Sequence, residues 1–286
     1  MWDLIKELYF EAFIGSLLAA VLCSMVGSLL YLKRNIFLGL ALPQVSAAGI
    51  SFGLFILPGL GYALKEGGRQ TPELLIILTF AFVSVMVIIG ILLYLDAKGK
   101  GSEESRIAGT FAGAWTATIL FLNNTPFGKA YVDSMITGEA LSITKGDLFV
   151  LFGLFIFCLF WFLVFSKRLL IVIYDPEFAV SSGISKNLWL TIIHIITGLT
   201  IAFGVTTVGP LVVFALLALP SISARILCFS MRSFLVLVPL IGLLSHISGW
   251  LLSLKLDLPL GPSIALGSII CLVLAKLFKL LRFIKT

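Results

Sequence analysis

Long apolar runs alternate with short polar stretches along the whole chain. The runs are close to the roughly 20 residues that a helix needs to cross the hydrocarbon core of a bilayer. The polar stretches between them hold most of the charged residues, as loops between spans do. The pattern predicts nine membrane-spanning helices, within a range of eight to ten, at residues 12–32, 36–60, 72–95, 107–122, 148–165, 187–205, 208–229, 234–254 and 263–281.

The composition agrees with this pattern. Hydrophobic residues make up 60% of the 286 residues and charged residues only 12%, whereas a soluble domain is about 25% charged. So few polar residues cannot cover a surface that faces water on all sides. We therefore expect an all-α fold, a polytopic transmembrane helical bundle that forms a single domain over residues 1–286.

The net charge of +6 comes from basic residues that gather between the apolar runs, notably at Lys33-Arg34, Lys98, Lys167-Arg168 and near the C-terminus. Basic loops mark the cytoplasmic side of a membrane protein. This rule places the N-terminus outside and the C-terminus in the cytoplasm. No soluble module that could bind nucleic acid is visible, so the basic charge indicates topology.

Residues that could carry chemistry are few. The four cysteines lie singly inside apolar runs, so neither a zinc site nor a disulfide framework is expected. His194 and His246 each stand alone inside a span, and we expect a hydrogen-bonded structural role for both. The chain has no G-x-x-x-x-G-K-[ST] motif, so it cannot by itself cradle the phosphates of ATP. Uphill transport would need a partner or an ion gradient.

A polar segment at residues 174–186 interrupts the apolar pattern. Pro176 suits the first turn of a helix, and Asp175 is placed to cap that turn. Gly183 suits the position just beyond a helix end, because glycine readily adopts the left-handed conformation. The segment predicts a short capped helix in water between two spans, although an ordinary loop can have the same composition.

Four blocks of the sequence resemble the membrane permeases of bacterial ATP-binding-cassette (ABC) importers for zinc, manganese and iron. They resemble the basic and aromatic entry to the family's second helix, its D-P-E-x-A-x-x-x-G coupling segment, its V-G to A-R helix and its D-x-P-x-G-P outer turn. The blocks keep the family's order and together span most of the chain. They are Tyr31 to Gly39, Asp175 to Ala179 with Gly183, Val208 to Arg225, and Asp257 to Pro262.

The resemblance implies a permease in the plasma (bacterial inner) membrane that is not an enzyme and holds no cofactor of its own. It implies a second permease copy, in a homodimer or a heterodimer, cytoplasmic ATPase subunits that bind ATP, and an extracytoplasmic substrate-binding protein. Membrane lipid surrounds such a chain, and nucleic acid is not a partner. The segment around 174–186 would couple to the ATPase, through Tyr174, Asp175, Pro176, Glu177, Phe178, Ala179 and Gly183.

One departure from the family bears on the cargo. The family's second helix usually carries an Asp and a His that suit a metal ion, and here Leu40 and Gln44 stand in their places. The expected pathway residues are Gln44, Pro43, Ser46 and Leu40. Three explanations stay open: looser coordination by Gln44 and backbone carbonyls, a second permease that supplies the ligands, or a cargo other than a bare divalent metal. A kink at Pro43 would free a carbonyl, which favours the first.

Other classes of function fit the residues less well. A secondary transporter or channel that works alone would need intramembrane carboxylates or a filter, and neither is visible. An intramembrane enzyme would need paired catalytic groups, and the histidines are solitary. A permease of the same architecture for a non-metal substrate remains an alternative to the metal importer.

Overall fold

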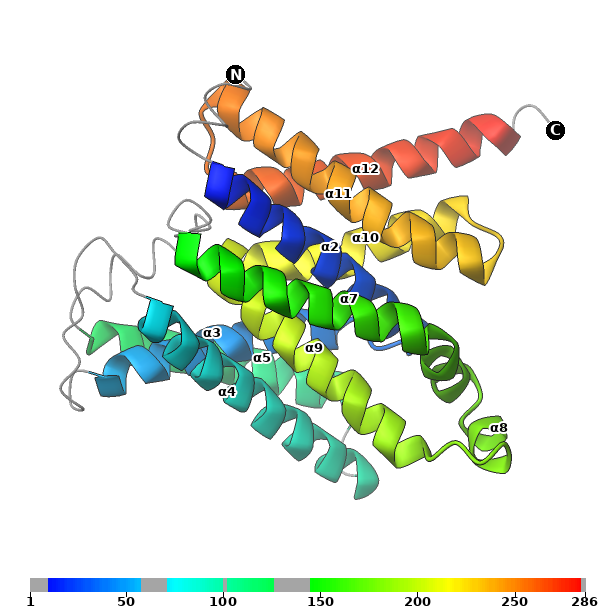
Figure 1. Ribbon diagram of the computed structural model, residues 1–286, viewed down its shortest axis with the longest axis horizontal. Helices are drawn as coiled ribbons and strands as arrows, with labels where there is room; N and C mark the ends of the chain where they lie inside the picture. The colour runs from blue at the N-terminus through cyan, green and yellow to red at the C-terminus, as the bar shows by residue number, and fades with distance from the viewer. Residues whose placement is uncertain (1–9, 58–70, 100–101, 126–144, 284–286) are drawn as a thin grey trace.

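The structure is a computed structural model that describes residues 10–57, 71–99, 102–125 and 145–283. Within these ranges every regular element is a helix, and the long helices run side by side in a tilted bundle (Figure 1). The helices are α2 (Phe10–Leu32), α3 (Leu38–Ile56), α4 (Thr71–Ala97), α5 (Glu103–Asn123), α7 (Lys145–Tyr174), α8 (Pro176–Ser181), α9 (Lys186–Val208), α10 (Pro210–Leu227), α11 (Met231–Leu256) and α12 (Leu260–Phe283).

Eight of the described helices, all except α5 and α8, are long and apolar enough to cross a membrane. α5 is a further long helix, and it packs along α3. The prediction of an all-α transmembrane bundle with eight to ten spans is therefore confirmed. The outer loops expected after residues 60 and 123 lie largely outside the described residues.

α2 lies at the centre of the bundle (Figure 1). Its most apolar window is 78% buried, whereas the corresponding window of α7 is only 17% buried. A Cβ atom added at Gly27 would overlap the backbone carbonyl of Leu217 in α10. Small residues let helix backbones come into contact in lipid, so this glycine allows α10 to cross directly over α2.

The end of α7 differs from the sequence-based expectation. The helix does not stop at residue 165 but continues through Lys167 and Arg168 to Tyr174. Leu169 and Val172 are buried and extend the helix's inner face past the basic pair. The pair lies on the exposed side, so charges that suggested a loop instead lie on the outer surface of a continuous helix.

The break between α9 and α10 also lies later than expected. Thr206 and Thr207 were natural candidates for the linker, but both are helical, and their hydroxyls donate to the carbonyl of Phe203 at 2.8 and 3.0 Å. The chain turns instead at Gly209, whose φ of 85° is in the region that favours glycine. Pro210 then opens α10 at a position where no backbone N–H is needed.

The helix ends that the sequence predicts to be cytoplasmic lie together. Figure 1 shows the C-terminal ends of α2, α7, α10 and α12 at the same end of the bundle as α8, and the start of α2 at the opposite end. This alternation agrees with the positions of the basic loops. Which end faces the cytoplasm stays a prediction.

Candidate functional site

The short helix α8 forms as the sequence predicts. The Asp175 carboxylate accepts a hydrogen bond from the backbone N–H of Phe178 at 2.9 Å and so caps the first turn. Gly183 has a φ of 75°, and its N–H donates to the carbonyl of Val180 at 3.1 Å. The next N–H, of Ile184, donates to the carbonyl of Ala179 at 2.8 Å. These two bonds are the standard closure of a helix by a left-handed glycine.

α8 has one buried side and one exposed side. Ala179 is fully buried and packs into a cluster with Leu169, Val172 and Trp189 from α7 and α9. The exposed side presents apolar side chains of α8 and of the last residue of α7, together with the Glu177 carboxylate and a half-buried Pro176. The exposed apolar side chains are Tyr174, Phe178 and Val180. They form a compact apolar surface, which we call the α8 knob.

A second region is a pocket of about 470 Å³ between α3, α5 and α10. Leu40 and Gln44, two of the four predicted pathway residues, line it. The Gln44 amide donates to the Thr118 hydroxyl of α5 at 3.3 Å. None of the lining residues is ionisable. They are Leu40, Gln44, Phe111, Trp115, Thr118, Ile119, Leu122, Pro210, Leu211 and Phe214.

The other two predicted pathway residues do not reach this pocket. Pro43 lies inside α3 and is buried. Ser46 is fully buried, and its hydroxyl has no hydrogen-bond partner within the described residues. The described residues also contain no group of three His, Cys, Asp or Glu side chains that could hold a metal ion. The pocket therefore offers only the neutral oxygens of Gln44 and Thr118.

The outward face of α5 next to this pocket is made of small residues. Gly109 and Gly113 are exposed, and an added Cβ atom at either would meet no atom of the described residues within 4 Å. Ala108, Ala112 and Thr116 are exposed beside them. We call this stripe the α5 small face. The spacing of the two glycines is visible in the sequence, but only the structure shows that the stripe points outward.

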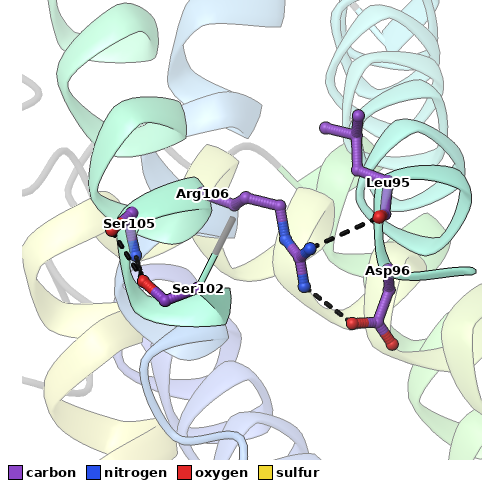
Figure 2. Close-up of polar contacts among 5 residues, drawn as sticks. All are labelled: Leu95, Asp96, Ser102, Ser105 and Arg106. Atoms are coloured by element: carbon purple, nitrogen blue, oxygen red, sulfur yellow. Dashed lines mark hydrogen bonds and ion pairs between the residues drawn. The ribbon is translucent and has the colours of Figure 1, made fainter. Parts of the chain in front are cut away.

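A third region is a polar pocket of about 100 Å³ where α2, α3, α4, α5 and α9 meet near the α8 end of the bundle. Arg106 of α5 donates to the Asp96 carboxylate at 2.6 Å and to the Leu95 carbonyl at 3.4 Å, which ties the two ends of the α4–α5 connection together (Figure 2). Ser102 caps α5 through the N–H of Ser105. This ion pair was not anticipated from the sequence.

The same pocket contains a contact between Lys33 and His194, whose Nζ and Nε2 atoms lie 3.2 Å apart. Burial lowers the pKa of the Lys33 ammonium, while the negative charges of Glu103 and Asp96 act in the opposite direction. His194 is therefore hydrogen-bonded, as predicted for it. Its partner lies 161 residues away in the chain, so no local pattern could have identified it.

His246 is also hydrogen-bonded. It is fully buried in α11, and its Nε2 lies 2.8 Å from the Ser16 hydroxyl of α2. Trp250 donates to the same hydroxyl at 3.2 Å, and the Phe13 ring packs against the imidazole. These contacts join α2 to α11 deep in the bundle, which supports the structural role predicted for His246.

Comparisons with known proteins identify a family, related membrane proteins and a solved structure to which this chain is similar. The ABC 3 transport family matches residues 5–279. The chain is 24% identical over 273 residues to a manganese transport system membrane protein, MntC, of Halalkalibacterium halodurans, covering 94% of this chain and 86% of the relative. It is 24% identical over 276 residues to the high-affinity zinc uptake system membrane protein ZnuB of Haemophilus influenzae, covering 96% and 98%. The solved structure of PsaBC from Streptococcus pneumoniae in complex with Fab aligns with a TM-score of 0.80 at 18% identity, covering 96% of this chain and 93% of that one.

Proposed function

The chain belongs to the ABC 3 transport family, and we propose that it is the membrane permease subunit of an ABC importer that moves zinc, manganese or iron into the cytoplasm. ATP would be bound and hydrolysed by separate ATPase subunits, and an extracytoplasmic binding protein would deliver the cargo. The relatives named for manganese and zinc transport support this class of cargo.

The observation that carries the proposal is the α8 knob. Tyr174, Phe178 and Val180 are exposed. α8 lies at the end of the bundle where α2, α7, α10 and α12 end (Figure 1), in a region expected to face water. Exposed apolar side chains on a rigid, capped helix indicate a protein partner. Burial of Ala179 against α7 and α9 means that force on α8 would be passed into the bundle. A cytoplasmic ATPase that docks on the α8 knob would therefore be coupled to the membrane helices.

The second permease copy is proposed to pack on the α5 small face. In lipid, helices associate through small residues that let backbones approach, and Gly-x-x-x-Gly is a common form of this motif. Gly109 and Gly113 have that spacing and open space above them. The pocket that holds Gln44 lies beside this face and is open. Two copies related by a twofold axis would close the pocket between them and bring two Gln44 side chains to one pathway.

The absence of carboxylates in this pocket shapes the proposed coordination of the cargo. Divalent cations prefer charged oxygen or imidazole ligands, but they can also be held by neutral carbonyls and retained water. We propose that the metal ion crosses with part of its water shell and with the carbonyl oxygens of the Gln44 side chains as neutral ligands. Loose coordination of this kind suits a transient site, because a tightly held ion would not leave.

The test uses the purified complex of permease and ATPase in lipid. Metal content and metal-stimulated ATPase activity are measured for the wild type, for Gln44→Ala and for Ser51→Ala as a matched control. Ser51 is a fully buried polar residue of the same helix, and its hydroxyl donates to the backbone carbonyl of Ala47 one turn earlier, its one partner among the described residues. Stimulation by zinc, manganese or iron that falls in Gln44→Ala and persists in Ser51→Ala supports the proposal. A wild-type complex that responds to none of these metals would redirect the search to a non-metal cargo.

A further inference from the structure

The contact between Lys33 and His194 joins the corner between α2 and α3 to α9. Lys33 is the first residue after α2, in the short corner that leads to α3. His194 lies two turns into α9, the helix that follows α8. Their side chains meet inside the polar pocket at 3.2 Å.

The chemistry of the pair fixes the direction of the hydrogen bond. An ammonium group has donors but no acceptor, so the Nε2 atom of His194 must accept. The imidazole is then neutral, with its proton on Nδ1. The Asp96 carboxylate is bonded to Arg106, and Lys33 has no carboxylate within salt-bridge distance among the described residues. The lone pair of His194 is thus the direct partner of a largely buried charge, which would be costly to leave without one.

On one side of the contact, His194 is rigidly connected to α8. The N–H of Ile184 donates to the carbonyl of Ala179, which holds the residues leading into α9 against the end of α8. Trp189, one turn before His194, packs in the same cluster as Ala179 and Leu169. A movement of α8 would therefore carry the first turns of α9 with it.

On the other side, Lys33 is rigidly connected to α3. The N–H groups of Lys33 and Asn35 donate to carbonyls at the end of α2 at 3.0 Å, which holds the corner to that helix. The corner is joined to the start of α3 by the N–H of Leu38, which donates to the Asn35 carbonyl at 3.2 Å, and by the N–H of Gly39, which donates to the Ile36 carbonyl at 2.8 Å. The first turn of α3 carries Leu40, with Gln44 one turn later, and both line the pocket between α3, α5 and α10. A displacement of the corner would therefore reach the pocket that holds Gln44.

The polar pocket leaves the contact room to move. It has a volume of about 100 Å³, and Thr197, one turn after His194, lines it with a hydroxyl that has no partner within the described residues although it is only 1% exposed. A group of this kind can accept or donate a hydrogen bond when the pair shifts. The Lys33–His194 contact therefore has free space beside it and a second polar group, the Thr197 hydroxyl, within the same pocket. A tightly packed apolar contact has neither.

We propose that the Lys33–His194 hydrogen bond is the joint through which movement of α8 reaches α3, so that both are positioning residues for coupled transport. The inference rests on the proposed function, because it presumes an ATPase that moves α8. Neither side chain touches the cargo. Their role is to make α9 and the α2–α3 corner move together, which apolar surfaces that can slide past each other would not ensure.

The experiment compares substitutions that keep or remove the hydrogen bond. In His194→Gln the side-chain carbonyl can still accept from Lys33, whereas His194→Leu and Lys33→Met remove one partner. His246→Gln, at the other buried histidine, is the matched control. Cargo moved per ATP hydrolysed is measured in proteoliposomes that contain the complete complex. We expect His194→Leu and Lys33→Met each to lower this ratio on the order of fivefold while ATP hydrolysis continues. His194→Gln and His246→Gln should stay within about twofold of the wild type.

A second measurement does not depend on the cargo. Hydrogen exchange of residues 33–39 is followed in the permease in lipid, and it should become faster in His194→Leu and Lys33→Met but not in His194→Gln. The double variant should be no worse than either single one, because the two residues share one interaction.

The proposal would be overturned if His194→Leu moved as much cargo per ATP as the wild type. It would also be overturned if His194→Leu and His194→Gln lowered this ratio equally. These outcomes are distinct from failure of the proposed function, which would appear as a wild-type complex with no response to metal. In that case the hydrogen-exchange comparison still tests whether the pair holds the corner to α9.

Discussion

The α5 small face and the outer face of α7 are both exposed in the isolated chain, yet their side chains differ greatly in size. α7 presents large apolar side chains, among them Phe152, Phe160 and Leu163. The α5 small face presents glycine, alanine and threonine, and the large exposed apolar side chains of this helix begin only at Trp115. Large apolar side chains are well placed against lipid tails, whereas small ones suit contact with another helix. Exposure in a single chain therefore predicts two different environments, lipid for α7 and a second copy for α5.

Glycines in the interior of the bundle show how closely a neighbouring helix approaches a glycine that is in a helix–helix contact. At Gly27 and Gly49 an added Cβ atom would overlap atoms of the neighbouring helices. At Gly109 and Gly113 the same atom meets nothing. The residue type is the same in both places, but only the interior pairs have their partner within the chain. The comparison predicts that the partner of the α5 glycines comes from outside it.

The largest expected effect is at the interior glycines. Gly27→Ala should destabilise the permease by about 3 kcal/mol, because its Cβ would overlap the backbone of Leu217, which cannot move aside as a flexible side chain could. Thermal unfolding in detergent measures this effect. Gly90→Ala in α4, where the added Cβ meets nothing within 4 Å, is the control and should not destabilise. Equal losses in the two variants would contradict the close crossing of α2 and α10.

The next effect separates the two outer faces. Gly113→Leu should weaken association of the permease copies in lipid by on the order of tenfold or more, because it keeps the helix backbones apart. Gly153→Leu in α7 is the control, since that glycine is also exposed and has equally open space above it. Energy transfer between labelled copies in liposomes measures association. If both substitutions weakened association equally, the α5 small face would be no more an interface between copies than the outer face of α7.

A smaller effect is expected at the α8 knob. Phe178→Ala should weaken binding of the ATPase subunit by about 1–2 kcal/mol, because an exposed aromatic side chain at the centre of an interface supplies much of the contact area. Phe160→Ala in α7 is the control, since the two side chains are 55% and 59% exposed. Binding is measured by titrating ATPase onto permease in nanodiscs. If ATPase binding were lost in Phe160→Ala and kept in Phe178→Ala, the ATPase interface would lie on α7 and not on the α8 knob.

The smallest effect concerns orientation and leaves activity unchanged. Cys228 follows α10 at the same end of the bundle as α8 and is half-buried, whereas Cys23 is fully buried. Burial raises the pKa of the Cys228 thiol, although the positive charge of Arg225 opposes this. Its reaction with a membrane-impermeant maleimide should therefore be slow near neutral pH and accelerate as the pH rises, and it should occur only from the cytoplasmic side. Labelling from the outer side would reverse the predicted topology.

Local structure was well predicted where the signal is local. Asp175, Pro176 and Gly183 define the cap, first turn and end of α8 through bonds that reach at most five residues, and all three behave as expected. The end of α7 was wrong because Lys167 and Arg168 are compatible with both a loop and an exposed helix surface. The choice was made by Leu169 and Val172, whose burial depends on distant helices.

For the same reason, the structure brings only two of the four expected pathway residues to one pocket. That any of them lines the pathway stays a prediction. Leu40 and Gln44 share one side of α3, and the pocket between α3, α5 and α10 lies on that side. Pro43 and Ser46 lie elsewhere on the helix surface and do not line the pocket. Nothing in the sequence indicated Thr118 as the partner of Gln44, or Arg106 as the partner of Asp96.

By itself, the sequence determined that this is a bundle of apolar helices in a membrane and that successive helices run in opposite directions. It also determined the position of the short capped helix that interrupts them. Those properties follow from hydropathy over about 20 residues and from backbone preferences within one turn. Only the tertiary structure decided that α2 is central, that the α5 small face is exposed, and that Lys33 meets His194. Such contacts depend on how rigid helices pack against one another, and helix packing is set by side chains far apart in the chain.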